Sequence, residues 1–243
     1  MTSTPSLFRG DLPRIVTGVE HEYKWLITDV DLPGFADGTA AVLATLGHPA
    51  GFAAAVSDSS IQSSIYLDTV DWTLTKDSTS LAVIINYGRR RAIRWLMLKD
   101  TLLWAEGRRD SLEIGALVHE FPVSHVLEAW TEQPLAWLTR KFGGPLELKP
   151  YGATTQQRRQ ALISSQDGCS LGLSLDETIT RDESGVERAT DRWLEVETSQ
   201  SDFRSLSRLA AWARMITDRL GVEPHGQSKP ERTADLVRRL SVR

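Results

Sequence analysis

Most of the chain reads as short strands separated by turns of hairpin length. No repeating strand–helix–strand unit occurs among them, so antiparallel pairing is expected and a parallel sheet is disfavoured. About eight strands with helices outside predict an α+β protein built on an eight-stranded antiparallel β-barrel. The interior of such a barrel can be filled by side chains or can hold one small ligand. The strands are expected near 19–28, 61–68, 81–86, 92–99, 102–108, 153–164, 170–180 and 188–198.

Four helices are expected, and local residues suggest where some of them start or stop. Asp37 is expected to cap the first helix. Pro134 should break or kink the second, and Gly221 should end the third. The helices are expected over 37–46, 123–142, 202–220 and about 231–241.

Residues 19–243 are expected to form a single domain. No internal repeat, low-complexity tract or linker divides them. The preceding residues, 1–18, hold two prolines and two glycines and are expected to form an irregular N-terminal arm. This arm contains Arg9, Asp11 and Arg14 and lacks the apolar core of a signal peptide.

Composition narrows the class of protein. The hydrophobic content of 41% and the charged content of 25% are ordinary for a soluble globular protein. A net charge of −4 gives no general attraction to nucleic acid or to an anionic membrane. No apolar run approaches the ~20 residues of a membrane helix. The single Cys169 excludes an intramolecular disulfide and a cysteine-rich zinc site. We therefore expect a cytoplasmic protein without nucleic-acid or membrane partners; its oligomeric state is not predicted.

The stretch 19–28 holds the strongest candidate for a site. In a strand, alternate side chains share a face, so Glu20, Glu22 and Lys24 would line one side. Burying two carboxylates and an ammonium together is costly unless each has a partner. A divalent cation for the acids and a phosphate for the lysine would satisfy all three. For this motif taken alone, a solvated strand face is the alternative.

Further motifs follow in an order that resembles the CYTH superfamily, also called triphosphate tunnel metalloenzymes. The family opens with Glu-x-Glu-x-Lys, and a Tyr-x-Asp-Thr segment, a strand ending in Leu-Lys, a late Glu-x-Glu strand and a Ser-Lys before the terminal helix follow. The match spans residues 19–237 in the family's order. In this chain the motifs are Glu20-His21-Glu22-Tyr23-Lys24, Tyr66-Leu67-Asp68-Thr69, Leu98-Lys99, Glu195-Val196-Glu197 and Ser228-Lys229.

The resemblance implies a barrel open as a tunnel, with Mg²⁺ or Mn²⁺ on its glutamates and a polyphosphate on its basic residues. Family activities include hydrolysis of inorganic triphosphate, thiamine triphosphate or RNA 5′-triphosphate ends, and cyclisation of ATP by class IV adenylate cyclases. By position, the implied metal ligands are Glu20, Glu22, Asp176, Glu195 and Glu197. The implied catalytic residues are Glu20, Glu22, Lys24 and Lys99, and the implied phosphate contacts are Lys24, Lys99, Arg108, Arg158 and Lys229.

The chain departs from the family where cations would be expected. The strand after the Tyr-x-Asp-Thr segment usually reads Leu-Arg-x-Arg, but Ala82 and Ile84 stand at the two arginine positions. The family commonly supplies more arginines in the strand expected at 153–164, where this chain has Ala153 and Thr155. Each lost cation contact can cost about 1.5–3 kcal/mol of phosphate binding.

Part of the tunnel is therefore expected to be apolar. We predict that Ile84 and Trp193 contact the substrate, provided that the strands keep a regular alternation. Such a cavity suits a phosphate ester with an apolar or aromatic body better than inorganic triphosphate. Ordinary core packing in a partly filled barrel is the alternative. The other apolar residues expected on these faces are Leu26, Ala82, Trp95 and Met97.

Three functions are open at this point, and all involve a phosphorylated small molecule. The favoured one is a metal-dependent phosphohydrolase acting on an organic di- or triphosphate, because acid pairs occur together with Lys24 and Lys99. The second is a diphosphate-releasing lyase or cyclase, acting on a nucleotide or a terpene-like substrate. The third is a phospholigand-binding module without catalysis, which the missing cations would also explain.

Overall fold

The computed structural model describes residues 15–47, 51–57, 59–88, 92–118 and 133–239. Eight antiparallel strands of this part of the chain close into a barrel, and a ninth pairs with the barrel from outside. The strands are β1 (Ile15–Leu26), β2 (Phe52–Val56), β3 (Ser60–Asp68), β4 (Thr79–Tyr87), β5 (Ala92–Ala105), β6 (Arg108–Val118), β7 (Lys149–Ser165), β8 (Ser170–Asp182) and β9 (Glu187–Thr198).

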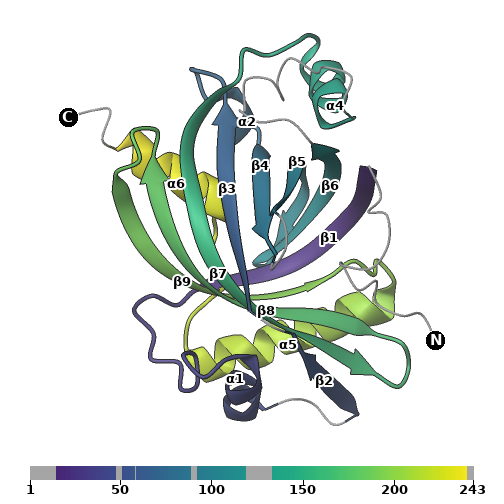
Figure 1. The fold of residues 1–243 in the computed structure, drawn as a ribbon. Helices are drawn as coiled ribbons and strands as arrows, with labels where there is room; N and C mark the ends of the chain where they lie inside the picture. Colours follow the sequence, from purple (N-terminus) through teal and green to yellow (C-terminus); the bar gives the residue numbers. More distant parts are fainter. Residues whose placement is uncertain (1–14, 48–50, 58, 89–91, 119–132, 240–243) are drawn as a thin grey trace.

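The barrel runs in the order β7-β3-β4-β5-β6-β1-β9-β8 and closes where β8 pairs with β7. The long strand β7 also pairs with the extra strand β2 through its last residues. Short turns in the described part of the chain connect β5 to β6, β7 to β8 and β8 to β9, whereas β1 pairs with two strands that are distant in the sequence, β6 and β9. The predicted eight-stranded antiparallel barrel is therefore confirmed (Figure 1).

The helices lie against this barrel (Figure 1). No helix in the described part of the chain is long and apolar enough to cross a lipid bilayer. The helices are α1 (Thr39–Leu46), α2 (Thr73–Lys76), α4 (Gln133–Phe142), α5 (Phe203–Leu220) and α6 (Lys229–Arg238).

The two larger apolar clusters lie outside the barrel wall, and a smaller one includes the inward-facing Tyr66 and Ala82. Trp212 and Ile216 of α5 are buried against outward-facing residues of β1, β8 and β9, including Trp25. A second cluster places Leu135 and Leu138 of α4 against β4, β5 and β6. Figure 1 shows α1 and α5 on one side of the barrel and α4 on the other. Because alternate side chains of a strand point to opposite faces, this arrangement leaves polar side chains to line the interior.

The strand boundaries differ from the prediction at two places that matter for the site. β1 begins at Ile15, inside the segment expected to be an irregular arm. The segment expected as one strand over 102–108 instead contains the end of β5 and the first residue of β6. Glu106 and Gly107 make the turn with φ of 51° and 78°, so a hairpin was missed there. β2 and α2 were also not predicted.

The helix ends show where capping was and was not predicted well. Asp202 caps α5 by accepting hydrogen bonds from Arg204 N and Ser205 N. Gly221 ends the helix, as predicted. α1 begins after Gly38 without a side-chain cap, so the role predicted for Asp37 was wrong. Pro134 is the second residue of α4 as the structure describes it, so the break or kink predicted there is not tested. The rest of that predicted helix, up to residue 132, falls outside the described residues.

Candidate metal and anion site

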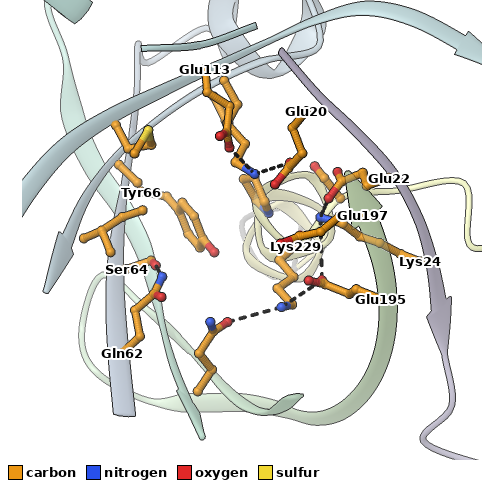
Figure 2. Close-up of a pocket in the computed structure, with 18 of the residues that line it drawn as sticks. Glu20, Glu22, Lys24, Gln62, Ser64, Tyr66, Glu113, Glu195, Glu197 and Lys229 are labelled. Carbon is orange, nitrogen blue, oxygen red and sulfur yellow. Dashed lines mark hydrogen bonds and ion pairs between the residues drawn. The ribbon is translucent and has the colours of Figure 1, made fainter. Parts of the chain in front are cut away.

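A cavity of about 210 Å³ occupies the interior of the barrel. β1 and β9 supply acids to one side of it, and β3 supplies Gln62, Ser64 and Tyr66 to the other (Figure 2). The N-terminus of α6 reaches the same space. The lining residues are Glu20, Glu22, Lys24, Gln62, Ser64, Tyr66, Ser80, Ala82, Ile84, Met97, Lys99, Arg109, Glu113, Gln156, Arg158, Glu195, Glu197, Ser228, Lys229 and Pro230.

Three carboxylates meet at one point of this cavity. Glu22 of β1 is paired in register with Glu197 of β9, and Glu20 precedes them on the same face of β1. One oxygen from each of the three carboxylates lies within 4.8 Å of the others. Antiparallel pairing thus brings together acids that are 175 residues or more apart in the sequence.

The electrostatics of this acid cluster favour a bound cation. Burial and the neighbouring Glu20 carboxylate raise the pKa of Glu197 to about 8. Burial likewise raises the pKa of Glu22, although Lys24 opposes the shift. The positive charge around these carboxylates is therefore too small to favour ionisation of all three at once. Hard oxygen donors of this kind suit Mg²⁺ or Mn²⁺, so Glu20, Glu22 and Glu197 fit a divalent metal ion.

A second acid pair is already neutralised by side chains. Arg158 Nη2 lies 2.6 Å from both Asp176 Oδ2 and Glu195 Oε2. Lys229 Nζ lies 2.9 Å from Glu195 Oε1 and also pairs with Asp176. These cations hold the pKa of Glu195 well below its usual range despite burial. Asp176 and Glu195, both predicted as metal ligands, are thus placed in an ion-pair network beside the acid cluster.

Lys24 and Lys99 are the cations nearest the acid cluster. Lys24 Nζ lies 2.8 Å from Glu22 Oε2 and 3.6 Å from Glu195 Oε1. Lys99 Nζ lies 2.6 Å from both Glu20 Oε2 and Glu113 Oε1. The surrounding carboxylates raise the pKa of both lysines above its ordinary value, even though burial lowers it. Both side chains therefore remain charged at neutral pH.

Searches of the sequence against protein-family models and against curated protein sequences found no match. Solved structures do resemble this one. A candidate adenylate cyclase from Bacillus halodurans is 20% identical, with a TM-score of 0.55 over 89% of this chain and 97% of its own. A Hippeastrum protein with a dominant triphosphatase activity is 16% identical, with a TM-score of 0.57 over 89% and 95%. The PH1819 protein from Pyrococcus horikoshii OT3 is 18% identical, with a TM-score of 0.53 over 89% and 98%.

The chain has the CYTH fold. The fold expected from the five short motifs is confirmed. The barrel is closed and eight-stranded, and the similar structures cover 89% of this chain. Residues from the five motifs also come together in space. In this CYTH barrel, Glu20, Glu22, Lys24, Lys99, Arg158, Lys229, Glu195 and Glu197 all line one cavity, together with Ile84.

Two predicted substrate contacts lie elsewhere in the CYTH barrel. Arg108 donates from Nε and Nη2 to Asp110, which also contacts His21 on the outer face of β1. Trp193 is buried against the His225 ring, with centroids 5.3 Å apart, and is not among the residues that line the cavity. The next residue along, Arg109, points inward in place of Arg108.

Arg109, Glu113 and Gln156 are lining residues that the sequence did not reveal. Arg109 and Glu113 share the inner face of β6, a strand that was not recognised. Gln156 and Arg158 show that even-numbered residues of β7 point inward. Thr155, at one of the positions where arginines were sought, instead bonds Ser63 beside it, so the register used for that comparison was one residue off. Recognising residues 108–118 as a separate strand, with alternate side chains from Arg109 pointing inward, would have identified Arg109.

Proposed function

We propose that this protein is a divalent-metal-dependent phosphohydrolase that cleaves a phosphoanhydride of an organic di- or triphosphate inside the barrel. The observation that carries the proposal is the cluster of Glu20, Glu22 and Glu197 beside the charged Lys24. In a metal–phosphate complex, the carboxylates would bind the metal ion and the ammonium would bind a phosphate oxygen. The triphosphatase activity of the Hippeastrum protein, which shares the fold, supports the reaction class.

The proposed roles follow from position. Glu20, Glu22 and Glu197 would hold Mg²⁺ or Mn²⁺, which when bound polarises a phosphoryl group and lowers the pKa of a ligated water. Lys24 and Lys99 would contact phosphate oxygens, since both remain protonated and lie beside the acid cluster. Fixed cations in a cavity shielded from bulk water stabilise the charge of the phosphoryl oxygens more strongly than they would in water.

Three further cations, Arg158, Lys229 and Arg109, would anchor the terminal phosphate. Arg158 and Lys229 are held by Asp176 and Glu195, which fixes their positions before a ligand arrives. Arg109 is held by Glu231 and by the hydroxyl of Thr101. Such preorganised side chains avoid part of the ordering cost of binding.

We also propose a cytoplasmic location, because a single cysteine fits a reducing compartment. Cell fractionation beside a cytosolic marker protein tests this location.

Phosphate release tests this function. Purified protein is incubated with Mg²⁺ or Mn²⁺ and a panel of organic and inorganic di- and triphosphates, and the same panel is repeated with chelator, with Glu22→Gln and with Glu177→Gln. Glu177 is a part-exposed acid of β8 outside the cavity and serves as the matched control. We expect metal-dependent release that Glu22→Gln abolishes and Glu177→Gln retains. Equal turnover by wild type and Glu22→Gln would remove the site from the mechanism.

The organic product separates hydrolysis from the alternatives. Mass spectrometry should find the organic monophosphate from a diphosphate, or the correspondingly shortened nucleotide from a nucleoside triphosphate. A cyclic or eliminated product would show a lyase or cyclase in the same cavity instead. Metal-dependent binding without turnover of any substrate in the panel would identify a binding module.

A further inference from the structure

The cavity has two chemically different walls. The acid cluster and Lys24 occupy the side formed by β1 and β9, and Lys99 reaches Glu20 from the neighbouring part of β5. Across from them, β4 and β5 present Ala82, Ile84 and Met97, without a charge among the three. β3 pairs with β4 and adds the uncharged polar side chains of Gln62, Ser64 and Tyr66, which Figure 2 shows across the cavity from the acid cluster.

The apolar wall continues along the strands through residues that share its face. Ile84 is paired in register with Trp95, and Trp95 with Leu117. Directly paired residues of antiparallel strands point to the same side, so all three belong to the inner face. Gly115 extends the wall to β1, because a Cβ at that position would lie 2.8 Å from Met97 Cε and 2.7 Å from Val16 Cγ2. The side chains of Met97 and Val16 therefore pack closely over Gly115.

The charge balance limits how many phosphates the site can neutralise. Among the described residues, seven carboxylates line the cavity or pair with its cations, against five cations. One divalent ion would bring the fully ionised set to neutrality without leaving an excess of positive charge. Every phosphate would then add negative charge that no further side-chain cation offsets, so the balance favours a short phosphate chain over a long one. The acids are Glu20, Glu22, Glu113, Asp176, Glu195, Glu197 and Glu231, and the cations are Lys24, Lys99, Arg109, Arg158 and Lys229.

From the apolar wall and the charge balance together, we infer that the substrate is a diphosphate ester with an apolar alkyl or aryl body. Its phosphates would face the acid cluster and the cavity's cations, and its body would lie along Ile84, Met97 and the inner face of β4 to β6. This inference rests on the proposed function for the phosphate end of the substrate, and it adds the identity of the other end. Apolar surface of the body leaves water against the side chains of Ala82, Ile84 and Met97, which have no hydrogen-bonding groups to desolvate.

Calorimetry with non-hydrolysable probes tests the inference without depending on turnover. The probes are methylenediphosphonate, its O-geranyl ester, its adenosine ester and a methylene-bridged inorganic triphosphate, each titrated into the full chain with Mn²⁺. We expect the geranyl ester to bind at least roughly tenfold more tightly than methylenediphosphonate, because its methylene groups are buried. The adenosine ester and the triphosphate analogue should both bind more weakly than the geranyl ester.

Variants locate the binding energy on the apolar wall. Ile84→Ser and Met97→Ser should each reduce affinity for the geranyl ester by roughly fivefold or more, and leave methylenediphosphonate unchanged. Ile61→Ser is the matched control, since Ile61 is an exposed residue of β3 outside the cavity lining. A thermal melt of each variant checks folding, and Met97→Ala replaces any serine variant that melts early.

The outcomes separate this inference from the proposed function. Tight geranyl-ester binding that Ile84→Ser weakens, without phosphate release from geranyl diphosphate or any other member of the substrate panel, supports the inference and contradicts the phosphohydrolase. If affinity or turnover does not depend on the organic body, or is highest for the triphosphate, the inference is overturned and the phosphohydrolase is retained. If Ile84→Ser and Ile61→Ser change geranyl-ester affinity equally, the apolar wall is not the binding surface and the inference fails. No metal-dependent binding of any probe contradicts both.

Discussion

Lys229 Nζ lies 2.9 Å from Glu195 Oε1, which ties the start of the last helix to the last strand of the barrel. The same ammonium pairs with Asp176 of β8 and donates a hydrogen bond to Gln156 Oε1 of β7 at 3.2 Å. α6 is thus fixed to three strands by one side chain. The capping box of Ser228 and Glu231 sets the helix start at that point. The network therefore has a structural role as well as a proposed role in binding the anion.

Asp176→Asn should lower stability more than it lowers metal affinity. The Asp176 carboxylate is fully buried and pairs with both Arg158 and Lys229, so its neutralisation leaves two buried cations short of a partner. Loss of a buried pair of this kind costs about 3–5 kcal/mol in the free energy of unfolding. Urea denaturation measures that loss, and calorimetry with Mn²⁺ measures the metal. A large fall in Mn²⁺ affinity in folded Asp176→Asn would make Asp176 a ligand after all.

Glu197→Gln should have the opposite pattern. Glu197 belongs to the three-carboxylate cluster, whereas Glu113 lines the same cavity and pairs with Lys99. We expect Glu197→Gln to weaken Mn²⁺ binding by at least the roughly 10–100-fold that loss of an outer partner costs in metal sites. Glu113→Gln is the matched control and should retain Mn²⁺ affinity. Equal losses in both variants, measured by calorimetry, would place the metal outside the predicted cluster.

The barrel was predictable from the sequence because its signals are local. Alternation and turn residues indicate antiparallel strands. The order of the motifs along the chain indicates the barrel fold. The inner acids Glu20, Glu22, Glu195 and Glu197 followed from alternation within a single strand. The metal role assigned to Asp176 and Glu195 depended instead on which side chains lie opposite them. Only the pairing of β7 with β8, which sets Arg158 beside Asp176, supplies that information.

The errors at Arg108 and Thr155 have one physical cause. A shift of one residue in a strand moves every side chain to the other face, so a boundary error becomes an error of function. The hairpin at Glu106 and Gly107 was read as continuous strand, which exchanged Arg108 for Arg109. Trp193 shares the alternation of Glu195, but His225 covers its ring. A covering residue from a distant loop cannot be inferred from the strand alone.

The stability of the metal-free protein should fall as the pH rises from about 5 to about 8. The pKa of Glu197 is about 8 in the folded protein and 4.5 in its ordinary environment. Between these values the folded state keeps a proton that the unfolded state has lost, so raising the pH favours unfolding. Lys24 and Lys99 remain charged across this window and do not oppose the trend.

Thermal melts with chelator across this pH range measure the slope. Mn²⁺ should flatten it by favouring the ionised carboxylates, and Glu197→Gln should flatten it without metal. A slope in Glu197→Gln that matches wild type would assign the effect to other groups.

Arg109→Gln and Arg108→Gln should separate phosphate binding from fold support. Arg109 lines the cavity, and Arg108 pairs with Asp110 outside it. Loss of a charge-assisted contact to phosphate is expected to cost about 1.5–3 kcal/mol, or roughly tenfold to a hundredfold in affinity for methylenediphosphonate. Arg108→Gln should bind this probe as wild type does. Melting temperatures confirm that both variants fold, and equal affinities in the two variants would exclude Arg109 from the phosphate site.

Ile84→Arg should shift preference toward longer phosphate chains. Ile84 lines the cavity from β4, where the wall opposite the acid cluster carries no charge. A guanidinium at that position adds the positive charge that the cavity lacks for a third phosphate, and it replaces apolar surface that would contact the substrate body. We expect affinity for the methylene-bridged triphosphate to rise roughly tenfold or more and affinity for the geranyl ester to fall. Ile61→Arg, on the outer surface, should change neither. If triphosphate affinity rose equally in both variants, a general change in net charge would explain it, and the uncharged wall would not set phosphate number.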